Sequence, residues 1–302
     1  MLLCIIFILW GDFLTKNLTH FEKLNYAAQS IYDLGEHNVL IILNDGTNLT
    51  DWHDVDDRLD VLFVSENLSS ESDLKERYAD LNNLKAIVIS NITGNVTSME
   101  AMFRNCFRLA DVRTIDCDTS NVRKMNDLFL ECNGLSDISF LADWDVSRVE
   151  DMSSMFDVCF SLGDISPLAA WDVSNLKNAS YMFNDCHTLE DIGAFESWDV
   201  SGLWNMKGMF AACNYLKDLS SLSDWDVSNV CNMESLFDGC DYLDDVSPLK
   251  DWNVGNVRKM DCIFKDTNVK DARCLDGWNV QISDRSDIFR DCEISRKPKW
   301  VM

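Results

Sequence analysis

The sequence has few basic residues, few histidines and none of the short motifs that mark common catalytic sites. It contains 26 Lys and Arg against 51 Asp and Glu, which gives a formal net charge of −25. The electric field of such a negative protein repels nucleic acid and anionic membranes and attracts basic protein patches or divalent cations. Most of the charges serve general solubility. The four histidines, His20, His37, His53 and His187, form no recognisable group with a nucleophile, and a glycine-rich phosphate loop is absent. We therefore expect no catalytic residue, no cofactor and no nucleic-acid partner.

The chain also lacks an apolar run long enough to cross a membrane. The apolar run at its start, Leu2 to Trp10, has nine residues, which suits the core of a signal peptide but not a membrane span. No Lys or Arg precedes it, and no small-residue cleavage site is evident before Lys16. We treat residues 1–16 as an apolar N-terminal segment, either a signal peptide or a strand or helix that packs on the fold.

A repeat dominates the rest of the sequence. Tryptophans recur at intervals of 27 residues from Trp144 to Trp252, and a cysteine follows a phenylalanine by three residues in every copy except the one that has Thr267. A period of this size is the signature of a solenoid, in which function lies on a surface built by stacking. The expected core of the stack consists of Trp144, Trp171, Trp198, Trp225, Trp252, Phe156, Phe183, Phe210, Phe237, Cys159, Cys186, Cys213 and Cys240.

Two different spacings alternate within one copy. Apolar residues three or four apart predict a short helix from Val149 to Cys159, and Ser147 and Glu150 have the spacing of a helix cap. The segment from Leu162 to Trp171 favours a short strand and a turn, with Pro167 outside the sheet ladder. One copy buries too little apolar surface to offset the entropy of ordering it, so neighbouring copies must stack. The expected fold is an α/β solenoid of stacked coils, each with a short strand and a short helix.

The cysteines and the recurring aspartates each allow two interpretations. The repeated cysteines share one position and lack the paired spacing of zinc ligands, which favours core packing over metal or redox chemistry. Aspartates recur five residues after the cysteine and directly after the tryptophan, as in Asp164 and Asp145. We expect them to accept hydrogen bonds from turn amides two residues on, because Asn253 and Asn279 continue the second series. Calcium bound between neighbouring carboxylates is the alternative.

The segment before the repeats lacks their tryptophan and Phe-x-x-Cys pattern. Residues 17–95 predict a divergent α/β cap, with helices over Phe21–Leu34 and about Glu71–Leu84 and strands over Val39–Leu43, Val61–Val64 and Ala86–Ile89. We expect the last of these strands to join the sheet of the later coils. Seven to eight coils are expected over residues 96–292, followed by a tail over 293–302.

The residues Trp144-Asp145-Val146-Ser147-Arg148-Val149, with Met152, Met155-Phe156 and Cys159, resemble a known family. This is the repeat, roughly 25 residues long, of BspA-like and mycoplasma-lipoprotein-type surface proteins, and the match runs from about Val96 to Cys292. The resemblance implies a leucine-rich-repeat-like solenoid and often a role in adhesion or host contact at the cell exterior. It supplies no catalytic residues.

The location of the protein is less clearly marked. The resemblance favours the cell surface or secretion, and six sequons, among them Asn95 and Asn178, are compatible with it. Abundant cysteines without a pairing pattern favour a reducing interior instead. The expected function is therefore protein binding at the cell surface, with an intracellular scaffold and a calcium-dependent assembly module as alternatives.

Variable, outward positions are the natural binding residues of a repeat protein whose regular positions form the core. They lie in the equivalents of the segment between Leu162 and Trp171, on what we expect to be an exposed sheet face. The expected partner is a protein, one with a basic surface being the best fit. The candidate binding residues are Glu190, Glu196, Lys217, Asp224, Lys250 and Asp251.

Overall fold

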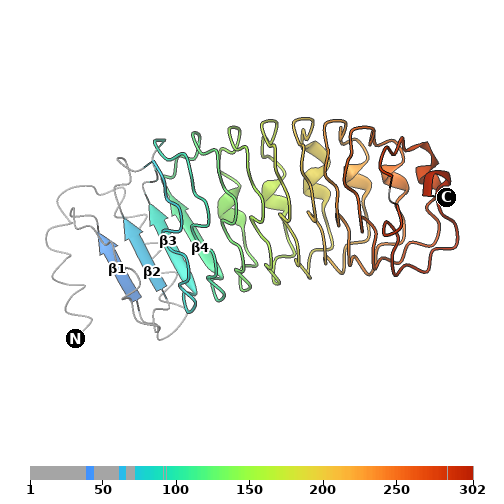
Figure 1. Ribbon diagram of the computed structural model, residues 1–302. Helices are drawn as coiled ribbons and strands as arrows, with labels where there is room; N and C mark the ends of the chain where they lie inside the picture. Colours follow the sequence, from blue (N-terminus) through green and yellow to red (C-terminus); the bar gives the residue numbers. More distant parts are fainter. Residues whose placement is uncertain are drawn as a thin grey trace.

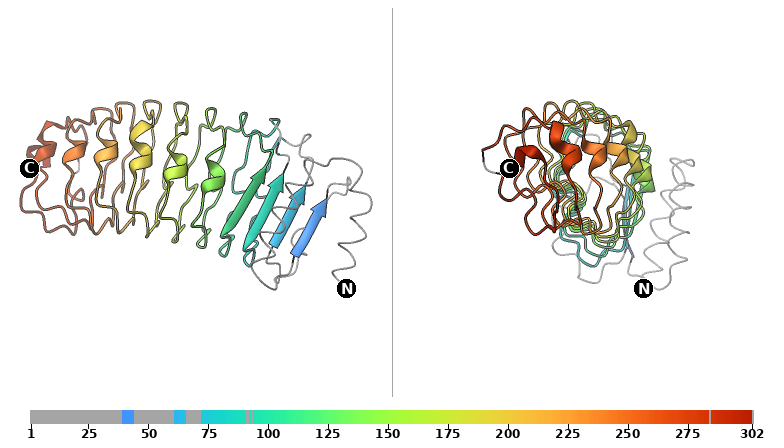
Figure 2. Two further views of the ribbon diagram at one scale, coloured as in Figure 1. Left: turned by 180° about the vertical axis from the view of Figure 1, so that it is seen from behind. Right: turned by 90° about the vertical axis from the view of Figure 1, so that its right-hand side faces the viewer.

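In the computed structural model the chain winds into an elongated stack of coils that follow one another from one end to the other (Figure 1). The structure describes the backbone of residues 39–43 and 61–65 and the residues 72–90, 92, 94–283 and 285–301. Viewed along the stack, successive coils lie nearly behind one another (Figure 2). The predicted repeat solenoid is confirmed, whereas the predicted helix and strand within each repeat are not.

Four parallel strands form a sheet at the N-terminal end of the stack. They are β1 (Val39–Leu43), β2 (Val61–Ser65), β3 (Ala86–Ser90) and β4 (Asp111–Ile115), paired in the order β1-β2-β3-β4. The three expected strands are confirmed, and β3 pairs with β4 of the next coil. Residues 72–84 form turns instead of the expected helix. The helix expected over 21–34 lies outside the described residues.

Beyond β4 the described coils contain no further strand, and short 3-10 helices take its place. The strand expected in the Leu162–Trp171 segment is therefore wrong, while Pro167 does lie outside any sheet, at the start of a 3-10 turn. These helices follow one another along one side of the stack (Figure 1). They are η3 (Ser139–Leu141), η4 (Ser166–Leu168), η5 (Gly193–Ser197), η6 (Ser220–Leu222), η7 (Ser247–Leu249), η8 (Arg273–Gly277) and η9 (Lys299–Val301).

The helix predicted from Val149 to Cys159 is also wrong, because the amides of this segment divide between two sets of partners. Met152 and Phe156 donate to carbonyls of the next coil, at 2.9 Å each. Met155 and Cys159 donate three residues back within their own coil, at 3.2 and 3.1 Å. Turns with a three-residue step bury the same side chains that a helix would, so the apolar spacing identified the core but not the backbone conformation.

Left-handed backbone at two positions in each coil prevents a continuous helix. Ser154 and Val158 have φ values of 52° and 62°, and the equivalent positions of other coils repeat them. Because non-glycine residues rarely adopt this conformation, hydrogen bonds to both neighbouring coils must hold it in place. The expected helix cap is absent, and Glu150 instead pairs with Arg123 of the preceding coil at 2.8 Å.

The core consists of aromatic files that run along the stack. The rings of one file stack with centroids 5.2–6.1 Å apart and planes within 19° of parallel. Such offset parallel contacts add to the free energy of burial. This file consists of Tyr78, Phe103, Phe129, Phe156, Phe183, Phe210, Phe237, Phe264 and Phe289.

The repeat tryptophans form a second file, and all of them except Trp144 also make a polar contact between coils. The indole N–H of Trp171 donates to the carbonyl of Leu141 at 3.0 Å, and Trp198, Trp225, Trp252, Trp278 and Trp300 repeat this bond. Trp144 lacks a partner for its buried indole nitrogen. The coil before it has strand β4 where the later coils have a 3-10 helix, so the accepting carbonyl is missing there.

All of the repeated cysteines except the half-buried Cys292 are buried, and each thiol of the series donates a hydrogen bond. The thiol of Cys159 donates to the carbonyl of Phe129 at 3.2 Å, and Cys186 and Cys213 donate in the same way at 3.3 and 3.1 Å. Burial raises the pKa of Cys106, at the head of the series, to about 12. Cys159, Cys186, Cys213 and Cys240 are all fully buried. The position therefore needs a small apolar side chain with a donor.

Candidate binding surface

The residues after each tryptophan connect one coil to the next and turn the chain. The carboxylate of Asp145 accepts the amide of Ser147 at 3.0 Å, and Asp172 and Asp199 do the same in their coils. The side-chain amide of Asn175 then donates to the carbonyl of Ser147 at 2.7 Å. This explains the Trp-Asp-Val-Ser-Asn motif, since its Trp, Asp and Asn side chains each satisfy a backbone group and its Ser hydroxyl donates to the Asp carboxylate.

The second aspartate series closes the turn that precedes each 3-10 helix. Asp164 accepts the amide of Ser166 at 2.9 Å, and Asp218 accepts that of Ser220 at 2.8 Å. Hydrogen bonds from the side chain and amide of Ser166 lower the pKa of Asp164. At the N-terminal end Asp111 departs from the pattern and pairs with Arg113 at 2.8 Å. The expectation of local turn caps is confirmed for the regular coils.

Calcium finds no prepared site in the part of the chain that the structure describes. No group of three or more acidic, cysteine or histidine side chains is placed to hold a metal ion there. In both aspartate series one carboxylate oxygen accepts a hydrogen bond from a turn amide, as in Asp145 and Asp164. The geometry therefore gives the calcium alternative no support.

Polar side chains form a further ladder between coils. Asn205 donates to the side-chain oxygen of Asn178 at 2.9 Å, and Asn178 donates to Asp151 at 3.2 Å. The oxygen of Asn178 also accepts the amide and hydroxyl of Ser180. Both ends of this amide are thus in use, which argues against Asn178 as a sugar-bearing residue in the folded protein.

The six candidate binding residues are all exposed but occupy two separate rows instead of one sheet face. Glu190 and Lys217 are equivalent residues of adjacent coils and form an ion pair. Glu196, Asp224, Lys250 and Asp251 form the other row, at the ends of η5, η6 and η7, just before the tryptophans. The expected exposed sheet face is wrong, because this side of the coil is a row of 3-10 helices.

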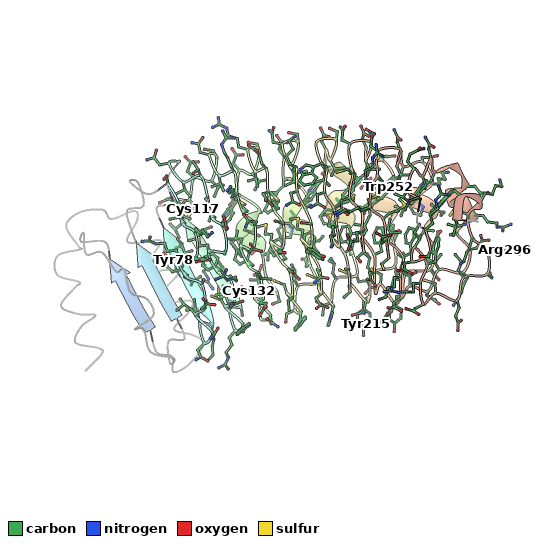
Figure 3. All side chains as sticks on the ribbon, viewed as in Figure 1. Tyr78, Cys117, Cys132, Tyr215, Trp252 and Arg296 are labelled. Atoms are coloured by element: carbon green, nitrogen blue, oxygen red, sulfur yellow. The ribbon has the colours of Figure 1, made fainter. Side chains whose placement is uncertain are left out.

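A set of exposed rings lies beside the first row. Phe160, His187, Tyr215 and Tyr242 come from four consecutive coils, in the turn that follows each repeated cysteine, and we call them the aromatic edge. Phe160 stacks on His187 with centroids 4.9 Å apart, and Tyr215 stacks on Tyr242 at 5.3 Å. The side chains remain between 37% and 59% exposed. Figure 3 shows Tyr215 at the lower margin of the stack.

Carboxylates accompany these rings. Asp185 lies 2.8 Å from the imidazole of His187, and Asp241 accepts the side-chain amide of Asn214 at 3.1 Å. The surrounding coils are strongly acidic, since residues 126–249 contain 23 Asp and Glu against four Lys and Arg, a net charge of −19. The aromatic edge thus lies in the most negative part of the stack.

The candidate binding residues predicted from the sequence do not include the aromatic edge. The indication was present, because Phe160 shares its repeat position with His187, and Tyr215 and Tyr242 follow one residue later. Large apolar residues at a position outside the buried pattern point to an exposed contact surface. What the sequence did not reveal is that the rings stack in pairs.

A known family matches most of the chain. The family described as "Mycoplasma protein of unknown function, DUF285" matches residues 72–194 and 188–300. The chain belongs to this family. The match confirms the resemblance to mycoplasma surface-type repeats that the tryptophan motif indicated. No curated protein matches the sequence.

Solved structures of leucine-rich repeat proteins show distant similarity. A leucine-rich repeat protein from Bacteroides ovatus ATCC 8483 has 16% identity and a TM-score of 0.35 over 61% of this chain and 50% of its own. The T. pallidum leucine-rich repeat protein has 15% identity and a TM-score of 0.31 over 62% and 81%. A leucine-rich cell surface protein of Faecalibacterium prausnitzii A2-165 has 14% identity and a TM-score of 0.23 over 83% and 89%.

This member of the family spans about half the length of the Bacteroides protein that it matches. Because the identities and TM-scores are low, the solenoid architecture rests on the contacts between coils described above. Among the described residues, no helix has the length and apolar character that a membrane crossing requires.

Proposed function

We propose that this protein is a non-catalytic repeat protein that binds another protein along the side of its stack. The observation that carries the proposal is that regular and variable positions have different roles within each coil. Regular positions such as Trp171, Asp172 and Cys159 are used in the core or in turns, and the variable positions are exposed. A long rigid surface with variable side chains suits an extended protein partner.

Charge favours a partner with a basic surface. The two rows of candidate residues contain four acidic and two basic side chains, and Lys217 is already paired with Glu190. A basic partner would be steered toward the negative central coils, whereas nucleic acid would be repelled. Complementary charge mainly accelerates association and selects the partner, so binding should weaken as ionic strength rises.

We further propose that the protein works at the cell surface or outside the cell. The abundance of cysteines opposed this location, but the repeated cysteines from Cys106 to Cys240 are fully buried and donate their thiol protons to carbonyls. Thiols held in this way do not meet an oxidant or one another while the coils remain folded. Identification of the mature N-terminus by mass spectrometry distinguishes a secreted protein from an intracellular scaffold.

Two charge variants test the binding proposal, because the structure divides the candidate residues into two rows. One variant carries Glu190→Gln and Lys217→Gln, and the other carries Glu196→Gln, Asp224→Asn, Lys250→Gln and Asp251→Asn. Each immobilised variant is compared with the wild type in capture of proteins from the native source, followed by mass spectrometry. We expect at least one of the two row variants to lose a protein that the wild type captures, while the melting temperature of that variant is unchanged.

A matched control carries Arg123→Gln and Glu150→Gln, which removes an exposed ion pair elsewhere on the stack. This control should capture the same proteins as the wild type. Identical capture by both row variants and the wild type would refute the assignment of these rows. Loss of capture that accompanies a lower melting temperature would indicate damage to the fold.

A further inference from the structure

We propose that the aromatic edge is a docking site for an extended, arginine-bearing polypeptide segment. This inference rests on the proposed function and names a surface and a recognition chemistry within it. Single exposed rings are ordinary on protein surfaces. Here four consecutive coils each expose a ring in the same turn, and the rings are stacked in pairs along the stack.

The turns that carry these rings are joined to one another, so the surface is held in place. The hydroxyl of Thr188 donates to the carbonyl of Phe160 at 3.0 Å, and the amide of Tyr242 donates to the carbonyl of Asn214 at 3.1 Å. Stacking fixes the ring planes as well, with interplanar angles of 22° and 12°. A prearranged surface of this kind loses little side-chain entropy when a ligand binds.

The charges around the rings select the ligand. Asp185 and Asp241 lie in the same turns, and Asp244 follows Tyr242 by two residues. A guanidinium group stacks on aromatic rings and pairs with carboxylates through a planar fork of donors. An ammonium group offers a point charge and no plane, so arginine matches a mixed ring and carboxylate surface better than lysine.

The length of the edge sets the size of the ligand. With stacked centroids 4.9–5.3 Å apart from coil to coil, four coils extend over about 15 Å. An extended chain covers this distance with about five residues at roughly 3.3 Å each. Arginines at alternate positions point to the same side of such a segment and would all face the edge.

Fluorescence anisotropy with two labelled peptides of equal charge provides the test. One peptide alternates glycine and arginine over four repeats, the other glycine and lysine, and both are titrated with the full chain at physiological ionic strength. We expect the arginine peptide to bind at least fivefold more tightly. Tyr215→Ser with Tyr242→Ser, which leaves the charge unchanged, should abolish this preference and leave the weaker binding of the lysine peptide as it is.

Trp204→Ser is the matched control, because Trp204 is 47% exposed but lies outside the aromatic edge. This variant should retain the preference for arginine. Equal affinity for the two peptides, or an equal loss in the Trp204 variant, would overturn the inference. Tight binding of a neutral glycine and serine peptide of the same length would also overturn it. None of these outcomes bears on capture by the two charged rows, so a failure here is distinguishable from a failure of the proposed function.

Discussion

Gly208 provides a sharp test of the coil geometry, because two separate properties penalise a side chain there. Its φ is +58°, and a Cβ atom would lie 2.5 Å from two carbon atoms of the Tyr181 ring in the preceding coil. Gly239 is the natural control, since its φ is +75° but the nearest atom to a Cβ lies 3.5 Å away. The two glycines thus share the left-handed backbone and differ in the clash.

We expect Gly239→Ala to cost little stability. The left-handed conformation costs an alanine about 1 kcal/mol, and the lower entropy of the unfolded chain returns roughly half of this. Gly208→Ala adds the displacement of the half-buried Tyr181 ring, which lies 5.6 Å from the Lys207 ammonium group in a cation–π contact. Loss of that contact and of ring packing should raise the total to about 2 kcal/mol.

Urea unfolding followed by circular dichroism measures both costs, and a Tyr181→Ala background isolates the clash. In that background Gly208→Ala should cost no more than Gly239→Ala, because no ring remains to be displaced. Equal costs for the two glycine substitutions in the wild-type background would refute the placement of Tyr181 over Gly208. A cost at Gly208 that persists without the Tyr181 ring would do the same.

Three further expectations concern the turns, the metal alternative and the thiols. Asp164→Ala should lower stability by about 1 kcal/mol and Asp164→Asn by much less, because an amide oxygen still accepts the amide of Ser166. Folding lowers the pKa of the Asp164 carboxyl. Its contribution to the free energy of unfolding is therefore complete above its pKa in the unfolded chain, about 4, and should disappear as the pH falls through the folded pKa. Acid titration of the wild type and of Asp164→Asn will show this loss. Calcium or a chelator should leave the melting temperature unchanged, and a calcium-dependent rise would revive the assembly alternative. A thiol reagent should label the half-buried Cys231 quickly and the buried Cys186 only on unfolding. Cys231→Ser should therefore reduce the fast phase of labelling, whereas Cys186→Ser should not. An equal reduction by Cys186→Ser would contradict the burial of Cys186.

The sequence by itself determined that this chain is a stacked repeat and which side chains form its core. The regular return of Trp171, Phe183 and Cys186 one period later requires equivalent environments, and only stacking provides them. It also indicated the role of Asp145 and Asp164, because a short acidic side chain caps a turn by purely local geometry.

Only the tertiary structure decided the backbone conformation within each coil. The amides of Met152 and Phe156 donate to the next coil, a partner that no local pattern reveals, and this diverts the segment from a helix into linked turns. The same contacts between coils bring Phe160 onto His187 and Tyr215 onto Tyr242. These pairs are 27 residues apart in the sequence, and only stacking of neighbouring coils brings their rings within van der Waals contact.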